Sequence, residues 1–246
     1  SLHTKDSIYS LGLKDQKEIN IILDEKVEPG YASLFQGEKR YPLYIDRSKD
    51  LVIELKGNVI CFTGALAPVN QYLNRQHLNL RTINWNLPEE KFIEQLNACC
   101  EKLKMSLESL NLDPCFVEKE KIRLKYLVAL NMITYPRMYR AQTKNFAYEP
   151  GKAYFDFMQS FIKDEDSILD AVEYQNVLNS FISILVQKEN GGIHDAYVEL
   201  RKELDYAFVH LKNPRVKAWF VNEQVCTFLK YKGVGKFDEL LPIYNE

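Results

Sequence analysis

Two adjacent cysteines, Cys99 and Cys100, are the residues whose type and spacing first suggest chemistry, either redox or metal binding. A zinc site usually takes two ligand pairs at CxxC-like spacing, and no CxxC occurs in this sequence. A helix turns by about 100° per residue, which places both thiols on one broad apolar face. Because free cysteine packs as a small buried hydrophobe, we expect both thiols to be reduced, mostly buried and slow to react with alkylating reagents. The apolar stripe, with Cys99 predicted at its centre, is Phe92, Leu96, Leu103, Leu107 and Leu110.

The remaining cysteines and the histidines are isolated along the chain. Cys61 falls in a predicted strand and Cys226 on a predicted helix. Cys115 follows Asp113-Pro114 at a predicted helix start, where the helix N-terminus can lower a thiol pKa, but a structural role is favoured there too. The histidines show no HExxH or other paired ligand spacing, so the sequence predicts no catalytic, cofactor-binding or metal-binding residue. They are His3, His77, His194 and His210.

Acidic residues are clustered at Glu89-Glu90 and at Asp164-Glu165-Asp166. Two carboxylates about 5–10 Å apart can hydrolyse glycosides, but these acids lie at predicted helix starts, where interaction with the helix dipole accounts for them. No GxSxG motif or phosphate-binding glycine loop is present. An enzyme that uses carboxylates is therefore the least favoured of three classes, and we expect this chain by itself not to be an enzyme.

One stretch, "TYPRMYRAQTKNFAY" (134–148), is both aromatic and basic. Tyrosine and arginine are favoured at protein interfaces, so Tyr135, Arg137, Tyr139 and Arg140 form a candidate interaction surface. The alternative is a helix–loop–helix corner whose aromatic rings pack on neighbouring helices, and this second interpretation is the favoured one.

Composition excludes several classes of protein. The 32 basic and 34 acidic residues give a net charge of -2, without the basic excess that phosphate contacts require, so no nucleic-acid partner is expected. No apolar run approaches the ~18 residues that span a bilayer. Five cysteines are too few for a disulfide scaffold in a chain of 246 residues.

The first quarter of the chain has the pattern of short antiparallel strands separated by turns. Pro42 lies inside one run and indicates an edge strand or a bulge, and Gly57-Asn58 is typical of a tight hairpin turn. We expect a β-rich domain over residues 1–66, an antiparallel meander or sandwich, followed by a transitional segment over 67–88. The strand-like runs are 17–26, 30–36, 39–46, 50–56 and 58–64.

The pattern from residue 89 onward is helical, so the fold class is predicted as α+β with an antiparallel helical bundle over 89–246. Pro136 is predicted to end or kink the second bundle helix. Asn213 and Pro214 are typical of an N-cap and a first helical position. The predicted helices cover 68–80, 89–110, 114–135, 151–163, 166–188, 193–211 and 214–231.

Five segments resemble the N-terminal, non-catalytic region of exported TlpA-like thiol-disulfide oxidoreductases of Bacteroidetes. They are "GYASLF" (30–35), "PLYIDRSKDLVIEL" (42–55), "FTG" (62–64), "NQYLN" (70–74) and the stretch from Asn213 to Glu246. The resemblance covers most of the chain from about residue 17 onward. The turn from Asp46 to Asp50 departs from it, because the family's usual glycine is missing there.

The resemblance implies that a thioredoxin-like domain with a WCxxC motif would follow Glu246, so no catalytic residue of the family can be assigned here. It implies a non-catalytic accessory module that positions this C-terminal domain, pairs protomers as a homodimer or presents protein substrates. It also implies a periplasmic location or a membrane anchor on the exported side. The alternative is a stand-alone peptide- or glycan-binding module of an exported protein, using the aromatic stretch 134–148.

Overall fold

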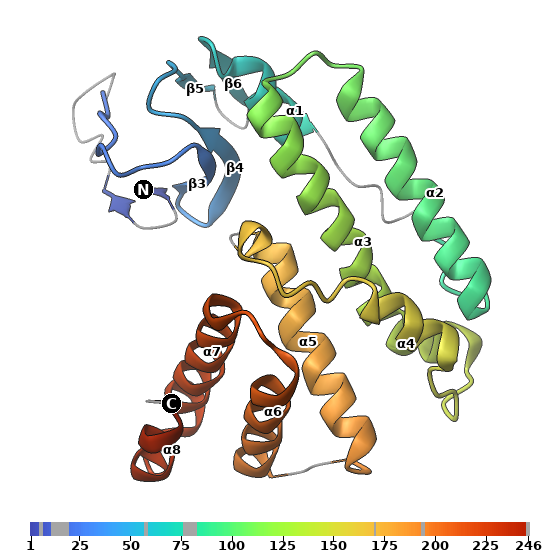
Figure 1. Cartoon of the computed structure of the whole chain (residues 1–246). Helices are drawn as coiled ribbons and strands as arrows, with labels where there is room; N and C mark the ends of the chain where they lie inside the picture. Colours follow the sequence, from blue (N-terminus) through green and yellow to red (C-terminus); the bar gives the residue numbers. More distant parts are fainter. Residues whose placement is uncertain are drawn as a thin grey trace. The chain divides into compact units, whose positions relative to one another are not determined.

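The computed structural model describes residues 1–4, 7–10, 20–56, 59–75, 83–169, 171–192 and 195–244. It confirms the α+β class, with antiparallel strands first and helices after them (Figure 1). The predicted turn at Gly57-Asn58, the histidines His77 and His194, and the end of the predicted helix 68–80 lie outside the described residues.

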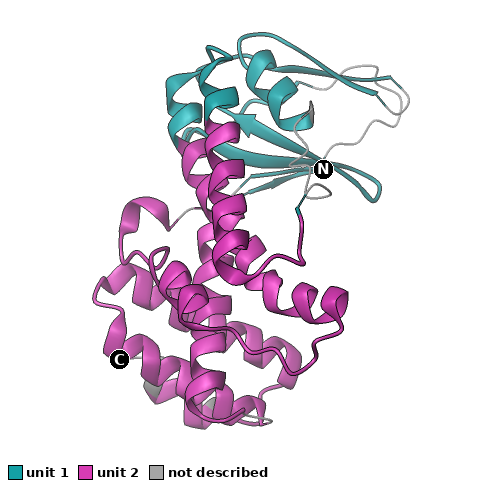
Figure 2. Ribbon diagram, turned by 90° about the vertical axis from the view of Figure 1, so that its right-hand side faces the viewer, with its two compact units in different colours: residues 1–83, 105–118 teal, residues 84–104, 119–246 magenta. Residues whose placement is uncertain are grey.

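The chain forms two compact units, shown in different colours in Figure 2. Unit 1 contains residues 1–83 and 105–118, and unit 2 contains residues 84–104 and 119–246. Residues 105–118 are largely helical and yet belong with the strands. Division by secondary-structure type at residue 88 is therefore not the same as division into compact units.

Unit 1 contains a four-stranded antiparallel sheet in the order β2-β1-β3-β4 and a two-stranded sheet. The central hairpin pairs Gly30 with Ile45 and Gln36 with Lys39, and its turn uses Gly37 at φ 59°. Residues 20–26 form no strand, contrary to the expectation for 17–26, because β1 pairs with β3 on the side away from β4. The strands are β1 (Leu2–His3), β2 (Ile8–Tyr9), β3 (Gly30–Gln36), β4 (Lys39–Ile45), β5 (Val52–Lys56) and β6 (Val59–Thr63).

Strand β4 is an edge strand, as Pro42 predicts, and helix α1 (Ala67–Arg75) covers its outer side. Asn70, which is fully buried, accepts a hydrogen bond from the Tyr44 N–H at 2.8 Å and donates to the Tyr44 carbonyl at 2.9 Å. Asn74 donates to the Pro42 carbonyl at 2.8 Å. The two asparagine side chains thus take the place of a neighbouring strand, which is one way to protect a sheet edge from further pairing.

A second contact joins the turn after β4 to the turn before α1. The Asp50 carboxylate accepts a hydrogen bond from the Ala65 N–H at 3.1 Å, and the Asp50 carbonyl accepts one from Leu66 at 3.2 Å. Gly64 lies between them at φ 95°, where an added Cβ would be 2.5 Å from Asp50 Oδ2. Glycine is therefore required at this position both by the backbone conformation and by the space available.

Two long helices follow, α2 (Glu89–Glu108) and α3 (Pro114–Thr143). Helix α3 does not end at Pro136, contrary to the prediction, and continues for another turn and a half to Thr143. An internal proline costs about 3 kcal/mol through a lost hydrogen bond and a steric clash. The neighbouring side chains of Met132 and Tyr135 are both fully buried, and their packing outweighs that cost.

The rest of unit 2 is a series of helices, and α6 packs against both α5 and α7. Asn213 is the N-cap of α7, as predicted, and its side chain accepts hydrogen bonds from the Arg215 and Val216 N–H groups. None of the helices in the described ranges is both long and apolar enough to cross a membrane. The helices are α4 (Lys152–Gln159), a 3₁₀ helix (Asp166–Ile168), α5 (Val172–Glu189), α6 (Ala196–His210), α7 (Pro214–Lys232) and α8 (Phe237–Tyr244).

Candidate functional site

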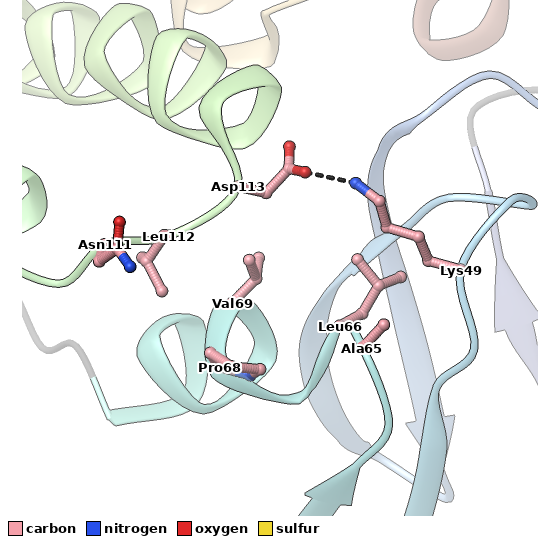
Figure 3. Close-up of a pocket in the computed structure, with 8 residues that line it drawn as sticks. All are labelled: Lys49, Ala65, Leu66, Pro68, Val69, Asn111, Leu112 and Asp113. Carbon is pink, nitrogen blue, oxygen red and sulfur yellow. Dashed lines mark hydrogen bonds and ion pairs between the residues drawn. The ribbon is translucent and has the colours of Figure 1, made fainter.

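Unit 1 has a pocket of about 330 Å³ where three connecting segments meet (Figure 3). The turn between β4 and β5 contributes one residue, the segment that leads into α1 and the start of α1 contribute four, and the segment before α3 contributes three. The lining residues are Lys49, Ala65, Leu66, Pro68, Val69, Asn111, Leu112 and Asp113. Apart from one ion pair and one amide, the lining is aliphatic, which is typical of a site that accepts an apolar group.

The ion pair at this pocket joins Lys49 to Asp113, whose side chains point toward each other in Figure 3. Lys49 also lies 3.5 Å from the carboxylate of Asp46. The Lys49 bond is the largest influence on Asp113 and holds the pKa of that carboxyl below its usual value. Burial alone would raise the pKa of Asp46, but hydrogen bonds from Ser48 and the charge of Lys49 outweigh it and lower this pKa too.

These charges decide what chemistry the pocket supports. The hydrogen bond to Asp113 raises the pKa of Lys49, so the ammonium stays charged while both carboxylates stay ionised. A general acid or base works best with a pKa near the operating pH, and none of these groups has been moved toward neutrality. The pocket is therefore suited to recognition, with an aliphatic floor and a charged margin, rather than to proton transfer.

Local structure explains how the third segment reaches the pocket. Asn111 has φ 46°, a left-handed conformation that asparagine adopts more readily than most residues. Asp113 then caps α3, because its Oδ1 accepts a hydrogen bond from the Phe116 N–H at 3.1 Å. Phe116 is fully buried and packs edge-on against Tyr44 and Tyr72, which attaches the start of α3 to the sheet and to α1.

The sequence did not single out Lys49, which lies in the turn of a quoted segment. The usable signal was the turn Asp46–Asp50 itself: without glycine, a turn with a lysine between two aspartates needs side-chain partners. Cys115, the cysteine at the start of α3, lies close to this pocket in sequence. It is exposed, and its Sγ is 3.7 Å from the Tyr44 hydroxyl.

The adjacent cysteines differ in their surroundings. Cys100 is buried, 7% exposed, whereas Cys99 is only half-buried. The buried stripe of α2 follows four-residue steps through Phe92, Leu96 and Cys100, so Cys100 and not Cys99 lies at its centre. The predicted stripe also included Leu110, which is 46% exposed beyond the end of the helix. All five cysteines, each within the described ranges, are free thiols.

Alkylation of the native protein is expected to follow this order of exposure. Cys115 and Cys226 are exposed and should react first, while Cys100 should react last. Burial raises the pKa of the Cys100 thiol, and only the thiolate reacts as a nucleophile. Mass spectrometry of peptides after timed treatment with iodoacetamide measures each rate, with denatured protein as the control. Equal rates at Cys100 and Cys226 in the folded protein would contradict the structure.

The structure divides the candidate surface of the aromatic stretch. Tyr135 is fully buried, and its hydroxyl donates a hydrogen bond to the Leu87 carbonyl at 2.8 Å. Burial raises the pKa of Tyr135 to about 12. Tyr139 and Arg140 are half-buried, and Arg140 donates to the Tyr148 carbonyl at 2.7 Å. Arg137 is exposed, so this stretch forms a packed corner with only part of the predicted surface facing solvent.

Glu89 holds that corner together, a role that sequence reasoning missed. Its Oε1 accepts hydrogen bonds of 2.5 Å from both the Tyr148 hydroxyl and the Gly151 N–H, and its Oε2 accepts one of 3.2 Å from the Tyr154 N–H. Glu89 is thus more than a solvated acid in the first turn of α2. It also provides the cap that the N-terminus of α4 lacks, since Gly151 has no side chain.

Comparison with known proteins adds no relative: no protein-family model, no curated protein and no solved structure matches this chain. Within the described ranges, no group of three or more histidine, cysteine, aspartate or glutamate side chains is placed to hold a metal ion. Function is therefore argued from the pocket, from the thiols and from the resemblance of the quoted segments.

Proposed function

We propose that this chain is a non-catalytic accessory module of an exported thiol-disulfide oxidoreductase. In this role it positions a C-terminal thioredoxin-like domain, pairs protomers or presents protein substrates, in the periplasm or on the exported face of a membrane. The pocket beside Lys49 and Asp113 is the contact point that we assign to the partner. Its aliphatic floor accepts one apolar side chain, and its charged margin selects the polar groups around it.

One observation supports the proposal most. The segments on which the resemblance rests are those that hold unit 1 together: "PLYID" is joined to "NQYLN" by Asn70 and Asn74, and "RSKD" is joined to "FTG" by Asp50 at Gly64. Segments that determine a fold are retained together more readily than scattered surface segments, because each depends on the others. The resemblance is therefore of the kind expected from a shared module.

The proposal predicts that the purified chain alone does not reduce disulfides. In an insulin-reduction assay with dithiothreitol, its rate should equal the background of dithiothreitol alone. Its thiols lie on four separate elements, β6, α2, α3 and α7, and no two are spaced as a CxxC pair. The Cys99→Ser and Cys100→Ser variants are the controls. A rate well above background that either substitution abolishes would contradict the proposal.

The pocket offers a second test, which also separates the proposal from a stand-alone peptide-binding module. Ala65 lines the pocket and is exposed, so Ala65→Trp should fill it without disturbing the core. The probes are an isolated TlpA-like thioredoxin-like domain and a library of short synthetic peptides. Binding of the domain, weakened about tenfold by Ala65→Trp and unchanged by Thr63→Trp, supports the accessory module. Binding of peptides alone overturns it in favour of the alternative.

A further inference from the structure

Helices α5 and α6 meet along a strip of polar side chains in the otherwise apolar interior of unit 2. On α5 the residues are Asn179, Ser183 and Gln187, which are four apart and so share one face. On α6 they are Glu199 and Glu203, one turn apart. We call these five residues the α5–α6 polar strip. Glu203 is only 7% exposed, and a buried carboxyl needs hydrogen-bond partners or a proton.

The hydrogen bonds of the strip can be counted atom by atom. Ser183 Oγ donates to Glu199 Oε1 at 3.1 Å, and Gln187 Nε2 donates to the same oxygen at 2.6 Å. Ser183 is also hydrogen-bonded to Glu203. A serine hydroxyl has one hydrogen and two acceptor lone pairs. Because that hydrogen goes to Glu199, Glu203 must itself be the donor in its bond to Ser183.

We propose that Glu203 is a proton-dependent contact between α5 and α6, in which its protonated carboxyl donates to Ser183 and completes the strip. Loss of the proton leaves two carboxylates competing for one hydroxyl hydrogen, with one of them buried. The helix pair then opens locally at this strip. This inference does not depend on the proposed function, because it concerns unit 2 alone.

The surroundings of Glu203 agree with this arrangement. Burial is the main cause that raises its pKa from 4.5 to about 7; Glu199 raises it further, and the bond with Ser183 opposes the shift. Glu199 is the charged group that acts on it, whereas the strip residues of α5 are neutral. Asn179 Oδ1, also buried in this strip, has no hydrogen-bond donor among the described residues. It provides a second acceptor for a proton on this strip, if the side chains rearrange.

The sign of the pH dependence follows from linkage. The folded state keeps the Glu203 proton more strongly than the unfolded or open state, so closure is favoured at low pH. Its contribution begins to fall above about pH 4.5 and is lost as the pH rises through about 7. Between about pH 5 and pH 8 the equilibrium constant for opening should rise roughly 70-fold.

Hydrogen–deuterium exchange of the full chain measures this opening. Exchange of the α5 and α6 amides, corrected for the intrinsic pH dependence, should accelerate by roughly that factor in the wild-type protein. Glu203→Gln should remove most of the acceleration, since an amide donates to Ser183 at every pH. Asp205→Asn, which removes an exposed charge from the same helix, should leave it unchanged.

A second measurement needs no variant that might fold poorly. Infrared spectroscopy of the wild-type protein at about pH 6 should show the carbonyl stretch of a protonated carboxylic acid, and this band should disappear by about pH 8.5, following the pKa of about 7. Absence of the band at pH 6 would overturn the proposal. Corrected exchange that does not change with pH in wild type, or that changes equally in Glu203→Gln, would overturn it as well.

Discussion

The variant Asn70→Ala should lower the free energy of unfolding of unit 1 by about 3–5 kcal/mol. Asn70 is fully buried and makes three hydrogen bonds, two to Tyr44 and one of 3.0 Å to the Leu66 carbonyl. Alanine leaves the Tyr44 N–H and carbonyl buried without these partners, and each such group costs about 1–3 kcal/mol. Urea unfolding followed by circular dichroism measures the change.

Asn74→Ala is the matched control for this prediction. Asn74 lies one turn later on α1 and also donates to a carbonyl of β4, but this bond is exposed to water. Water can replace it, so the expected loss is about 1 kcal/mol or less. The Asn70 variant should also associate more readily, because its sheet edge is no longer covered. If the two alanine variants lost equal stability, the assigned role of Asn70 would be wrong.

Glu89→Ala should destabilise unit 2 by about 2–4 kcal/mol. Three donors converge on this carboxylate, from Tyr148, Gly151 and Tyr154, and hydrogen bonds to a charged group contribute about 1.5–3 kcal/mol each before water replaces them. Burial and the bond to Glu89 both raise the pKa of Tyr148, which keeps its hydroxyl protonated as the donor. Guanidinium unfolding measures the loss.

Two further variants define this effect. Glu89→Gln keeps the volume but has only one acceptor oxygen, and its NH₂ group meets an N–H donor, so its stability should fall between wild type and Glu89→Ala. Glu90→Ala removes an exposed acid from the same helical turn and should change stability by less than about 0.5 kcal/mol. A Glu90 variant as unstable as the Glu89 variant would show that only the helix dipole is involved.

Local patterns in the sequence were enough to predict several features. Pro42 predicts an edge strand because it has no N–H to donate to a further neighbour. Asn213 and Pro214 predict the start of α7 because an asparagine side chain and a fixed φ both favour a helix start. The periodicity of α2 predicts an apolar face that includes the cysteines. All three depend on interactions within a few residues, which the order of residue types records.

Position within a predicted element was less certain. The projection of α2 placed Cys99 at the centre of the apolar face, whereas the structure places Cys100 there. A difference of one residue rotates the face by about 100°, and the neighbouring helices decide which rotation buries more surface. Pro136 likewise predicts a helix end from local cost alone, and the packing of Met132 and Tyr135 reverses that outcome.

The sequence by itself determined the α+β class, the order of strands and helices, and the residue types available at each turn. Only the tertiary structure decided that Asn70 meets Tyr44 across 26 residues, that Glu89 meets Gly151 across 62, and that Ser183 meets Glu199 across 16. The physical reason is that a polar side chain reads the same in a sequence whether water or a distant backbone group satisfies it. Folding makes that choice, because burial removes water and leaves one partner within reach.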